Sequence, residues 1–479
     1  MDGVTIDECI NDLKASTMFH MSLGSKELFH SNFLHWISIV NWDAFLKIMH
    51  GLAEVKEFWW EKEYRPEKNN VKVFREHRNF DLSIYVIYTE NNNNNDKVAD
   101  DDDTIETNFD SFGNKKVQRR IPVLVLENKM KSLPYKGQLE EYTKKAFEEW
   151  RKGETLIKSE INKLKSDSDE EKTADEEWIN KHGITFVLLS LMDTKIGNDD
   201  DYKIEQELSY RKKGDKKLKF PFKWNHTTYC KLVEILGEMI NKDSFPSNKD
   251  LDQSVVKDYK NFVTAFCNLA EKWKIKSGMN YRSQIFPWNI PEAHAKTEEI
   301  NKYKELRIHD IHEKILYNQL LRLLEGNLTD KGLLFKRYNS KTFKEEIKNN
   351  KCRIFTNSTY AHGVGIVEAF YAINDEFKLY IQVQGDRYCH MVIYKGIVSE
   401  GWDSGKKTLS VNMNDILKNG IPDKYISING SKPSFPWGEP SWGRYGNDNI
   451  YQFVKIPQTA TIKDVIDKIV EDFINYRLV

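Results

Sequence analysis

Two charged residues close a strongly apolar segment of the chain and could take part in metal-assisted chemistry. Glu127 and Lys129 follow the run IPVLVL at 121–126, whose composition is typical of a buried strand. Side chains two residues apart on a strand leave the same face of the sheet. A buried acid and base cost free energy unless they pair with each other or hold an ion. The two residues therefore indicate either an ion pair or a metal site.

Asp81 adds a second carboxylate near the start of the strand-like run FDLSIYVIY at 80–88. If the two strands are neighbours, Asp81 and Glu127 can share one divalent cation, and the main-chain carbonyl of Asn128 can supply a third oxygen. Hard cations such as Mg²⁺ and Mn²⁺ prefer oxygen ligands. The metal would lower the pKa of a bound water, and Lys129 would orient that water or stabilise charge developing on a phosphate. These residues predict phosphodiester hydrolysis with Mg²⁺ (or Mn²⁺) as cofactor.

The elements that must position these residues predict an α/β sheet flanked by helices. Residues 1–60 show helical spacing of apolar side chains, the next three apolar runs are strand-like, and Pro134 begins a further helix. The run GITFVLLS at 183–190 is apolar on both faces, which indicates a central strand. Two more helices are expected near 226–241 and 252–274. The order helix, three strands, helix, strand favours the α/β class.

Shifts in composition divide the chain into two predicted domains. Residues 1–275 form the predicted α/β domain, whose Asn- and Asp-rich insertion at about 90–118 is expected to be a mobile loop. A stretch with proline and glycine at 276–300 is the expected linker. Residues 301–479 are expected to form an α+β C-terminal domain that binds substrate or regulates the first domain.

Asp81, Glu127 and Lys129, on neighbouring strands with a helix after them, resemble the motif of the PD-(D/E)XK nuclease superfamily. The segment ELFHSNFLHW at 27–36 is similar to the opening helix of a bacterial branch of that superfamily, and Gln138 stands where that branch carries a glutamine. The resemblance implies a restriction-endonuclease-like mixed sheet flanked by helices. It also implies a metal-dependent nuclease.

The resemblance spans about residues 20–270 and implies roles for side chains outside the strand motif. Glu27 would be an added metal ligand or a water-binding group, and Gln138 would line the site. Tyr142 lies four residues after Gln138, so both side chains point the same way on a helix. We therefore place Tyr142 among the candidate substrate-binding residues.

The chain departs from the family motif at two points. Phe80 stands where the motif has proline, and Asp81 and Glu127 are 46 residues apart, which is more than usual. The insertion accounts for the second departure, because a surface loop can lengthen at little thermodynamic cost. Neither departure removes an acidic or basic group that the chemistry needs.

Other charged residues near the motif have a structural interpretation beside the functional one. Arg75 and Arg78 precede Asp81 and could contact substrate phosphates, or they could form a charged turn. His309 and His312 lie three residues apart on an expected helix. Two histidines alone do not make a metal site, so helix packing is the favoured interpretation there.

Composition excludes several classes of protein. The 72 basic and 73 acidic residues give a net charge of -1, so any contact with nucleic acid must come from local basic patches. Five cysteines without a CxxC pair argue against a cysteine zinc site and fit a reducing compartment. No apolar run approaches the roughly 18 residues of a membrane span, and the first residues lack a signal-peptide pattern. We expect a cytoplasmic protein without a membrane partner.

The sequence leaves three functional hypotheses. The first is a metal-dependent nuclease, with DNA the favoured substrate and RNA still open. Here the resemblance suggests antiviral defence against foreign DNA. The second is a catalytically decayed nuclease fold that binds nucleic acid or a partner protein. The third is a nuclease that its own C-terminal domain silences. A homodimer or a regulatory partner is possible under each of the three hypotheses.

Overall fold

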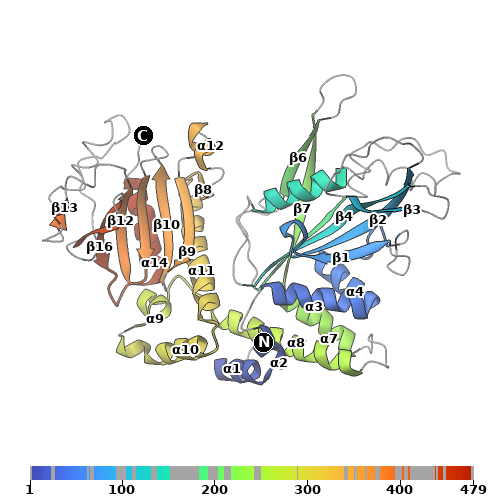
Figure 1. The fold of residues 1–479 in the computed structure, drawn as a ribbon. Helices are drawn as coiled ribbons and strands as arrows, with labels where there is room; N and C mark the ends of the chain where they lie inside the picture. Colours follow the sequence, from blue (N-terminus) through green and yellow to red (C-terminus); the bar gives the residue numbers. More distant parts are fainter. Residues whose placement is uncertain are drawn as a thin grey trace. The chain divides into compact units, whose positions relative to one another are not determined.

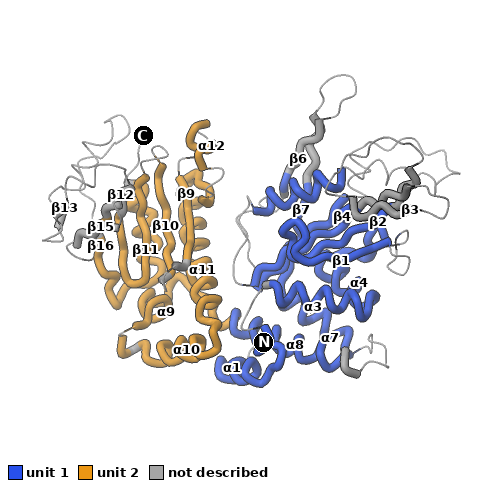
Figure 2. The backbone as a smooth tube through the Cα atoms, in the orientation of Figure 1, with its two compact units in different colours: residues 1–270 blue, residues 271–479 orange. Residues whose placement is uncertain are grey.

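The chain folds into two compact units, Met1–Ala270 and Glu271–Val479 (Figure 2). This computed structural model describes part of each unit. The described residues are 3–22, 27–61, 64, 70–92, 104–109, 115–130, 138–151, 183–191, 203–209, 217–241, 250–288, 290–338, 343–349, 352, 354–361, 364–372, 378–393, 402–403, 408–409, 437, 441–445 and 449–475.

Unit 1 is built around a seven-stranded mixed sheet (Figure 1). The strand order is β1-β2-β4-β5-β7-β6, and β3 also pairs with β4. The strands β1, β2 and β4 are antiparallel neighbours, β4, β5 and β7 are parallel, and β6 is antiparallel to β7. Their bounds are β1 Val71–Arg75, β2 Leu82–Asn92, β3 Thr104–Phe109, β4 Lys115–Lys129, β5 Thr185–Ser190, β6 Lys203–Ser209 and β7 Lys217–Thr228.

Helices cover both faces of this sheet. Figure 1 shows α3 and α4 on one face, and the teal helix 138–151 on the opposite face. The helix 138–151 is anchored by Trp224, whose indole donates to the Thr143 hydroxyl across 2.9 Å. The remaining bounds in unit 1 are α1 Ile6–Ala15, α2 Thr17–Ser22, α3 Glu27–Val40, α4 Trp42–Ala53, α7 Tyr229–Asn241 and α8 Asp250–Lys272, which runs across the unit boundary.

Local sequence signals set the ends of the N-terminal helices. Thr5 and Glu8 form a capping box at the start of α1, and the side chain of Asn41 caps α4. The helix α4 ends at Glu54, which adopts a left-handed conformation. It is therefore shorter than the helical pattern through residue 60 predicts.

Part of the insertion expected as a loop at about 90–118 forms strands. The ladder between β2 and β4 continues to the pair Asn92–Lys115, and β3 pairs with the same end of β4. Main-chain hydrogen bonds hold such a ladder without apolar side chains, so composition alone does not reveal it. Residues 93–103 and 110–114 lie outside the described part of the chain.

Unit 2 contains a second seven-stranded mixed sheet of order β15-β16-β12-β11-β10-β9-β8. Only β8 and β9 are parallel neighbours among these described strands. The strand bounds are β8 Phe335–Arg337, β9 Ile354–Ala361, β10 Val364–Ala372, β11 Lys378–Gln384, β12 Arg387–Ile393, β15 Ser441–Tyr445 and β16 Asn449–Lys455, with a separate pair β13 Trp402–Asp403 and β14 Thr408–Leu409. Because helices accompany a mixed sheet in both units, the expected α/β class is confirmed.

The helices α11 and α14 contact strands β9, β10 and β11 and enclose the core of unit 2. Leu320 and Leu324 of α11 meet Val367, Ile381 and Ile466 in this core. The remaining helical bounds are α9 Tyr281–Ile285, α10 His294–Glu305, α11 His309–Asp330, α12 Phe343–Lys348 and α14 Ile462–Asn475, with a 3-10 turn at Pro291–Ala293.

The stretch at 276–300, expected to be a linker, belongs instead to unit 2. It forms α9, the 3-10 turn and the start of α10. Tyr281 is fully buried and its hydroxyl donates to the carbonyl of Gly385 across 2.8 Å. The prolines and glycines that suggested a linker punctuate short helical turns, because proline fits the first turn of a helix.

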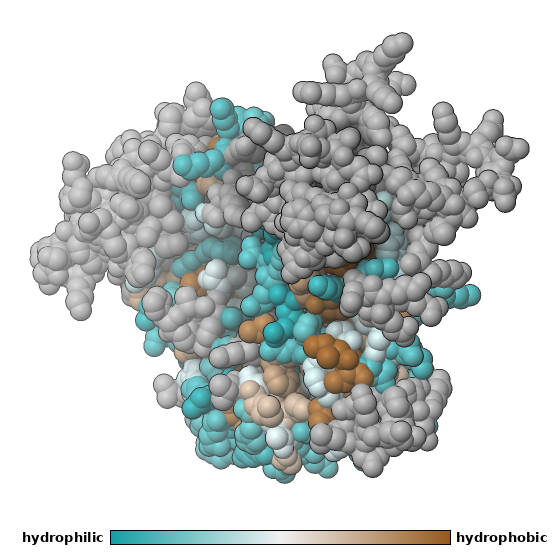
Figure 3. Space-filling view, turned by 45° about the vertical axis from the view of Figure 1, so that its right-hand side comes forward, coloured by the Kyte–Doolittle hydropathy of each residue, from teal (hydrophilic) through white to brown (hydrophobic). Residues whose placement is uncertain are grey.

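The surface in view in Figure 3 is mostly hydrophilic where it is described, with small apolar patches. Large hydrophobic side chains exposed to solvent in the described part of the chain are Met21, Leu28, Ile39 and Leu334. Within the same residues, no helix combines the length and the apolar character needed to cross a membrane.

Candidate active site

The candidate site lies where β4 ends and β2 begins. The antiparallel register pairs Leu82 with Leu126, which places Asp81 beside Glu127. Oδ2 of Asp81 accepts a hydrogen bond from the main-chain N–H of Asn128 across 2.7 Å. The structure therefore brings together the two carboxylates that lie 46 residues apart in sequence.

The carboxylate of Glu127 forms an ion pair with Lys129 and accepts a hydrogen bond from Gln138. Its side chain is 1% exposed, and Oε1 lies 2.6 Å from Nζ of Lys129. Nε2 of Gln138 donates to the same oxygen across 3.0 Å. Because Glu127 and Lys129 leave the same face of β4, the strand itself positions the pair. Gln138 is the first described residue of the helix 138–151, and its side chain reaches the pair from that helix.

Tyr142 completes the described group on this face of the sheet. Nε2 of Gln138 donates to the Tyr142 hydroxyl across 3.0 Å. Burial raises the pKa of Tyr142, and the nearby charges of Glu127 and then Asp81 raise it further, against the opposing effects of Gln138 and Lys129. Both carboxylates therefore act on one phenol, which remains protonated at neutral pH.

Phe80, the residue that stands where the resembled nuclease motif has proline, is fully buried. Its ring meets the ring of Tyr142 edge-on, with centroids 5.7 Å apart. The aromatic contact fixes the tyrosine against the start of β2. This departure from the motif thus has a packing role beside Asp81.

A second polar layer lies on the opposite face of β4. The side-chain oxygen of Asn128 accepts a hydrogen bond from the Tyr229 hydroxyl, and the ring of His30 meets Tyr229 edge-on at 4.9 Å. Nδ1 of His30 lies 2.8 Å from the hydroxyl of Tyr259. Burial lowers the pKa of His30 to about 3, so the imidazole is neutral. This layer fixes Asn128 from the face of β4 opposite to Glu127 and Lys129.

The two arginines expected to contact substrate lie at the turn between β1 and β2. Both are exposed, and Nε of Arg78 forms an ion pair with Oε1 of Glu149 at 2.8 Å. Arg75 donates to the side-chain oxygen of Asn32 on α3. These contacts hold the arginines in place, and their binding of phosphate stays a prediction.

Glu27 is the first residue of α3, and α3 contacts β1 and β4. The structure describes the backbone of Glu27 but not its side chain. Its expected role as a metal ligand or water-binding group therefore stays a prediction.

Two polar residues that the sequence interpretation missed extend the site along the sheet. The register aligns Glu127 with Leu188 and then with His226, and it aligns Lys129 with Ser190. Oγ of Ser190 lies 2.8 Å from Nε2 of His226. Ligands in open α/β sheets bind at the carboxyl ends of parallel strands, which is where these side chains lie. For Ser190 the signal in the sequence is a polar residue that ends an apolar strand.

The donor set at the end of β4 suits a hard divalent cation. Asp81 and Glu127 offer carboxylate oxygens and Asn128 a main-chain carbonyl, the ligand types that Mg²⁺ and Mn²⁺ prefer. The ammonium of Lys129 already balances one carboxylate, so the net charge available to a cation is modest. The residues fit such a metal with water or substrate oxygens filling the other positions.

Comparison of the chain with family models, with curated proteins and with solved structures found no match. The functional interpretation therefore depends on the residues and their geometry.

Proposed function

We propose that the protein is a metal-dependent nuclease that hydrolyses phosphodiester bonds, with DNA as the favoured substrate. One observation carries the proposal. Asp81, Glu127, Lys129 and Gln138 converge at the end of β4, where Lys129 and Gln138 both contact the buried Glu127 carboxylate and Asp81 is tied to the next main-chain N–H. Two acids and a lysine in this arrangement are the groups that metal-assisted hydrolysis needs.

The order of elements in unit 1 supports the same proposal. The helix α3 precedes the antiparallel strands β1, β2 and β4, then comes the helix 138–151, and β5 follows parallel to β4. A mixed sheet flanked by helices in this order is in keeping with the restriction-endonuclease-like fold that the sequence resemblance implies. The proposed site lies at the junction of its antiparallel and parallel halves.

Asp81, Glu127 and the carbonyl of Asn128 would hold Mg²⁺ or Mn²⁺, and the sequence resemblance adds Glu27. When bound, the metal lowers the pKa of a coordinated water and offsets charge on the phosphate. Lys129 places a positive charge next to the same site, where it stabilises developing negative charge. Gln138 fixes the orientation of the Glu127 carboxylate, and the exposed Arg75 and Arg78 supply charge for the substrate backbone.

The test compares cleavage by the wild type and by two matched variants, Glu127→Gln and Glu61→Gln. Glu61 is another largely buried carboxylate of unit 1, and it contacts His50 and the main chain of Phe58 rather than the candidate site. Each protein is assayed on plasmid DNA, single-stranded DNA and total RNA with Mg²⁺, Mn²⁺ or EDTA. We expect metal-dependent cleavage that Glu127→Gln reduces at least about a hundredfold and Glu61→Gln leaves intact.

Equal cleavage by Glu127→Gln and by the wild type would refute the proposed mechanism. Cleavage of RNA alone would keep the mechanism and change the substrate class. A role in defence against foreign DNA rests on the family resemblance alone. It would need a phage-challenge assay with the same two variants.

One observation favours the alternative of a fold that binds without catalysis. Lys129 already compensates the charge of Glu127, so the site is electrically satisfied without a metal. Calorimetric titration with Mn²⁺ separates the two functions when no substrate is cut. Binding that Glu127→Gln abolishes would indicate an intact metal site in a silenced enzyme, and absence of binding would favour the decayed fold.

A further inference from the structure

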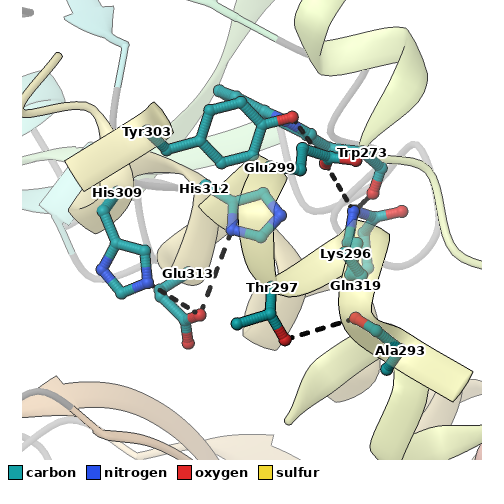
Figure 4. Close-up of polar contacts among 10 residues, drawn as sticks. All are labelled: Trp273, Ala293, Lys296, Thr297, Glu299, Tyr303, His309, His312, Glu313 and Gln319. Carbon is teal, nitrogen blue, oxygen red and sulfur yellow. Dashed lines mark hydrogen bonds and ion pairs between the residues drawn. The ribbon is translucent and has the colours of Figure 1, made fainter. Parts of the chain in front are cut away.

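A second group of potential metal ligands lies in unit 2 and has no part in the proposed nuclease site. His309, His312 and Glu313 occupy the start of α11 at spacings of three and four residues. Side chains at these spacings share one face of a helix. Figure 4 shows the two imidazoles flanking the carboxylate of Glu313.

The ligand atoms of the three side chains lie at distances close to those of a metal site. Nε2 of His309 is 3.4 Å from Oε1 of Glu313, and Nδ1 of His312 is 4.0 Å from the same oxygen. The three atoms lie within 4.8 Å of one another. Zinc bonds of about 2.0–2.1 Å place neighbouring ligands of a tetrahedron roughly 3.4 Å apart, so small side-chain adjustments close the set.

His312 is buried without a hydrogen bond in the described part of the chain. Its side chain is fully buried, and both ring nitrogens lack a hydrogen-bond partner there. The rings of Trp273 and Tyr303 pack edge-on and tilted against it, at centroid distances of 5.2 and 4.9 Å. A buried polar group without a hydrogen bond costs free energy, which a ligand at the imidazole would offset.

Burial, more than the surrounding charges, leaves His312 in the form that binds metals. Burial, and then the charges of Lys296 and His309, lower the pKa of His312 well below its usual value, so the ring is neutral. Lys296 is itself paired with Oε1 of Glu299 at 2.7 Å, and the Tyr303 hydroxyl donates to the same oxygen. Lys296 is therefore compensated and does not leave an isolated positive charge beside the group.

We propose that His309, His312 and Glu313 bind a transition-metal cation, with Zn²⁺ the ion that this donor set suits best. Two imidazoles and one carboxylate are a common zinc ligand set, whereas Mg²⁺ and Ca²⁺ prefer oxygen alone. His309 and Glu313 are 16% and 9% exposed, so solvent can reach the fourth position. Because all three ligands belong to one turn of α11, the ion would stabilise the start of that helix.

The test measures zinc binding to the metal-stripped full chain in a Glu127→Gln background, which removes the carboxylate of the other candidate site. His309→Ala and Glu313→Gln each remove one ligand at a partly exposed position. The matched control is His294→Ala, because His294 and Glu298 form an exposed histidine–glutamate pair on α10, four residues apart and separated by 3.5 Å. Affinity is measured by competition with a chromophoric chelator, and thermal melting reports folding and zinc-dependent stabilisation.

We expect one zinc per chain, a rise in melting temperature on binding, and a loss of affinity of at least about a hundredfold in both ligand variants. His294→Ala should change the affinity by less than about twofold. Absence of stoichiometric zinc binding to the parent chain overturns the proposal. It is also overturned if His309→Ala binds zinc as tightly as His294→Ala does. Neither result bears on nuclease activity, which depends on residues of unit 1.

Discussion

Replacing Lys129 by methionine removes the charge that balances Glu127 while keeping most of the side chain's length. The two side chains are 11% and 1% exposed, and their charged atoms lie 2.6 Å apart. Removing one partner of a buried ion pair costs about 3–5 kcal/mol, because the other charge is left uncompensated. Gln138 still donates to the carboxylate across 3.0 Å. We therefore expect the free energy of unfolding of unit 1 to fall by about 3 kcal/mol, the lower end of that range.

The assay must report on unit 1, because two units need not unfold in one transition. Hydrogen exchange at the amides of β4 and β5 gives the free energy of opening where the pair lies. The control is Lys231→Met on α7, whose partner Glu234 lies 3.2 Å away with the side chains 44% and 58% exposed. An exposed pair of this kind contributes at most about 1 kcal/mol. The double variant Glu127→Gln/Lys129→Met should recover much of the loss, because it leaves no buried charge unpaired.

Mn²⁺ links this measurement to the proposed function. If Glu127 also holds a metal, Mn²⁺ at a hundred times its dissociation constant should return about 2.7 kcal/mol to Lys129→Met and little to the double variant. A loss below 1 kcal/mol in Lys129→Met, equal to that of Lys231→Met, would refute the reasoning about the buried pair. Absence of rescue by Mn²⁺ would instead contradict the metal site.

Three further predictions concern stability. Burial raises the pKa of Glu368 to about 7 from its usual 4.5, so its contribution to the stability of unit 2 is complete below about pH 4.5 and is lost as the pH rises through 7. The loss is on the order of 3 kcal/mol. Glu368→Gln should therefore reduce the difference between the melting temperatures measured at pH 5 and at pH 8. Gly365→Ala should destabilise unit 2 by about 1–3 kcal/mol in urea unfolding, because an added Cβ would lie 2.0 Å from the buried Tyr317 ring. The control is Gly326→Ala, whose added Cβ meets open space and should not destabilise the unit. Deleting residues 91–116 should lower the melting temperature of unit 1, because the deletion removes β3 and one end of the β2–β4 ladder. An unchanged melting temperature would show that these pairs contribute nothing.

Elements with strong local signals were predictable from sequence. The apolar run before Glu127 and the run at 183–190 appear as the buried strands β4 and β5. The strands β6 and β7 were not predicted, although Phe220, Phe222 and Trp224 alternate along β7 as strand residues do. Pro221 and Lys223 stand between these aromatics and hide the pattern, because a proline within a run argues against a central strand. The packing against the helix 138–151 that makes Phe222 and Trp224 core residues is not a local property.

The candidate sites divide in the same way. Residue spacing correctly places Glu127 and Lys129 on one face, and the structure shows them in contact. The pairing of Ser190 with His226 joins strands that are distant in sequence, and no local pattern indicates it. At His312 the sequence favoured simple helix packing. The aromatic enclosure by Trp273 and Tyr303, which leaves the ring without a hydrogen bond among the described residues, depends on segments before α11.

The sequence by itself determined which segments are apolar, which side chains share a face, and which residue types could bind a metal. These properties follow from the two-residue and 3.6-residue periods of the backbone, which act over a few residues. The tertiary structure decided that Leu82 faces Leu126 and so brings Asp81 to Glu127. It also decided that Gln138 reaches the same carboxylate. Strand order and register depend on packing summed over the whole sheet, so contacts between distant segments exist only once the chain has folded.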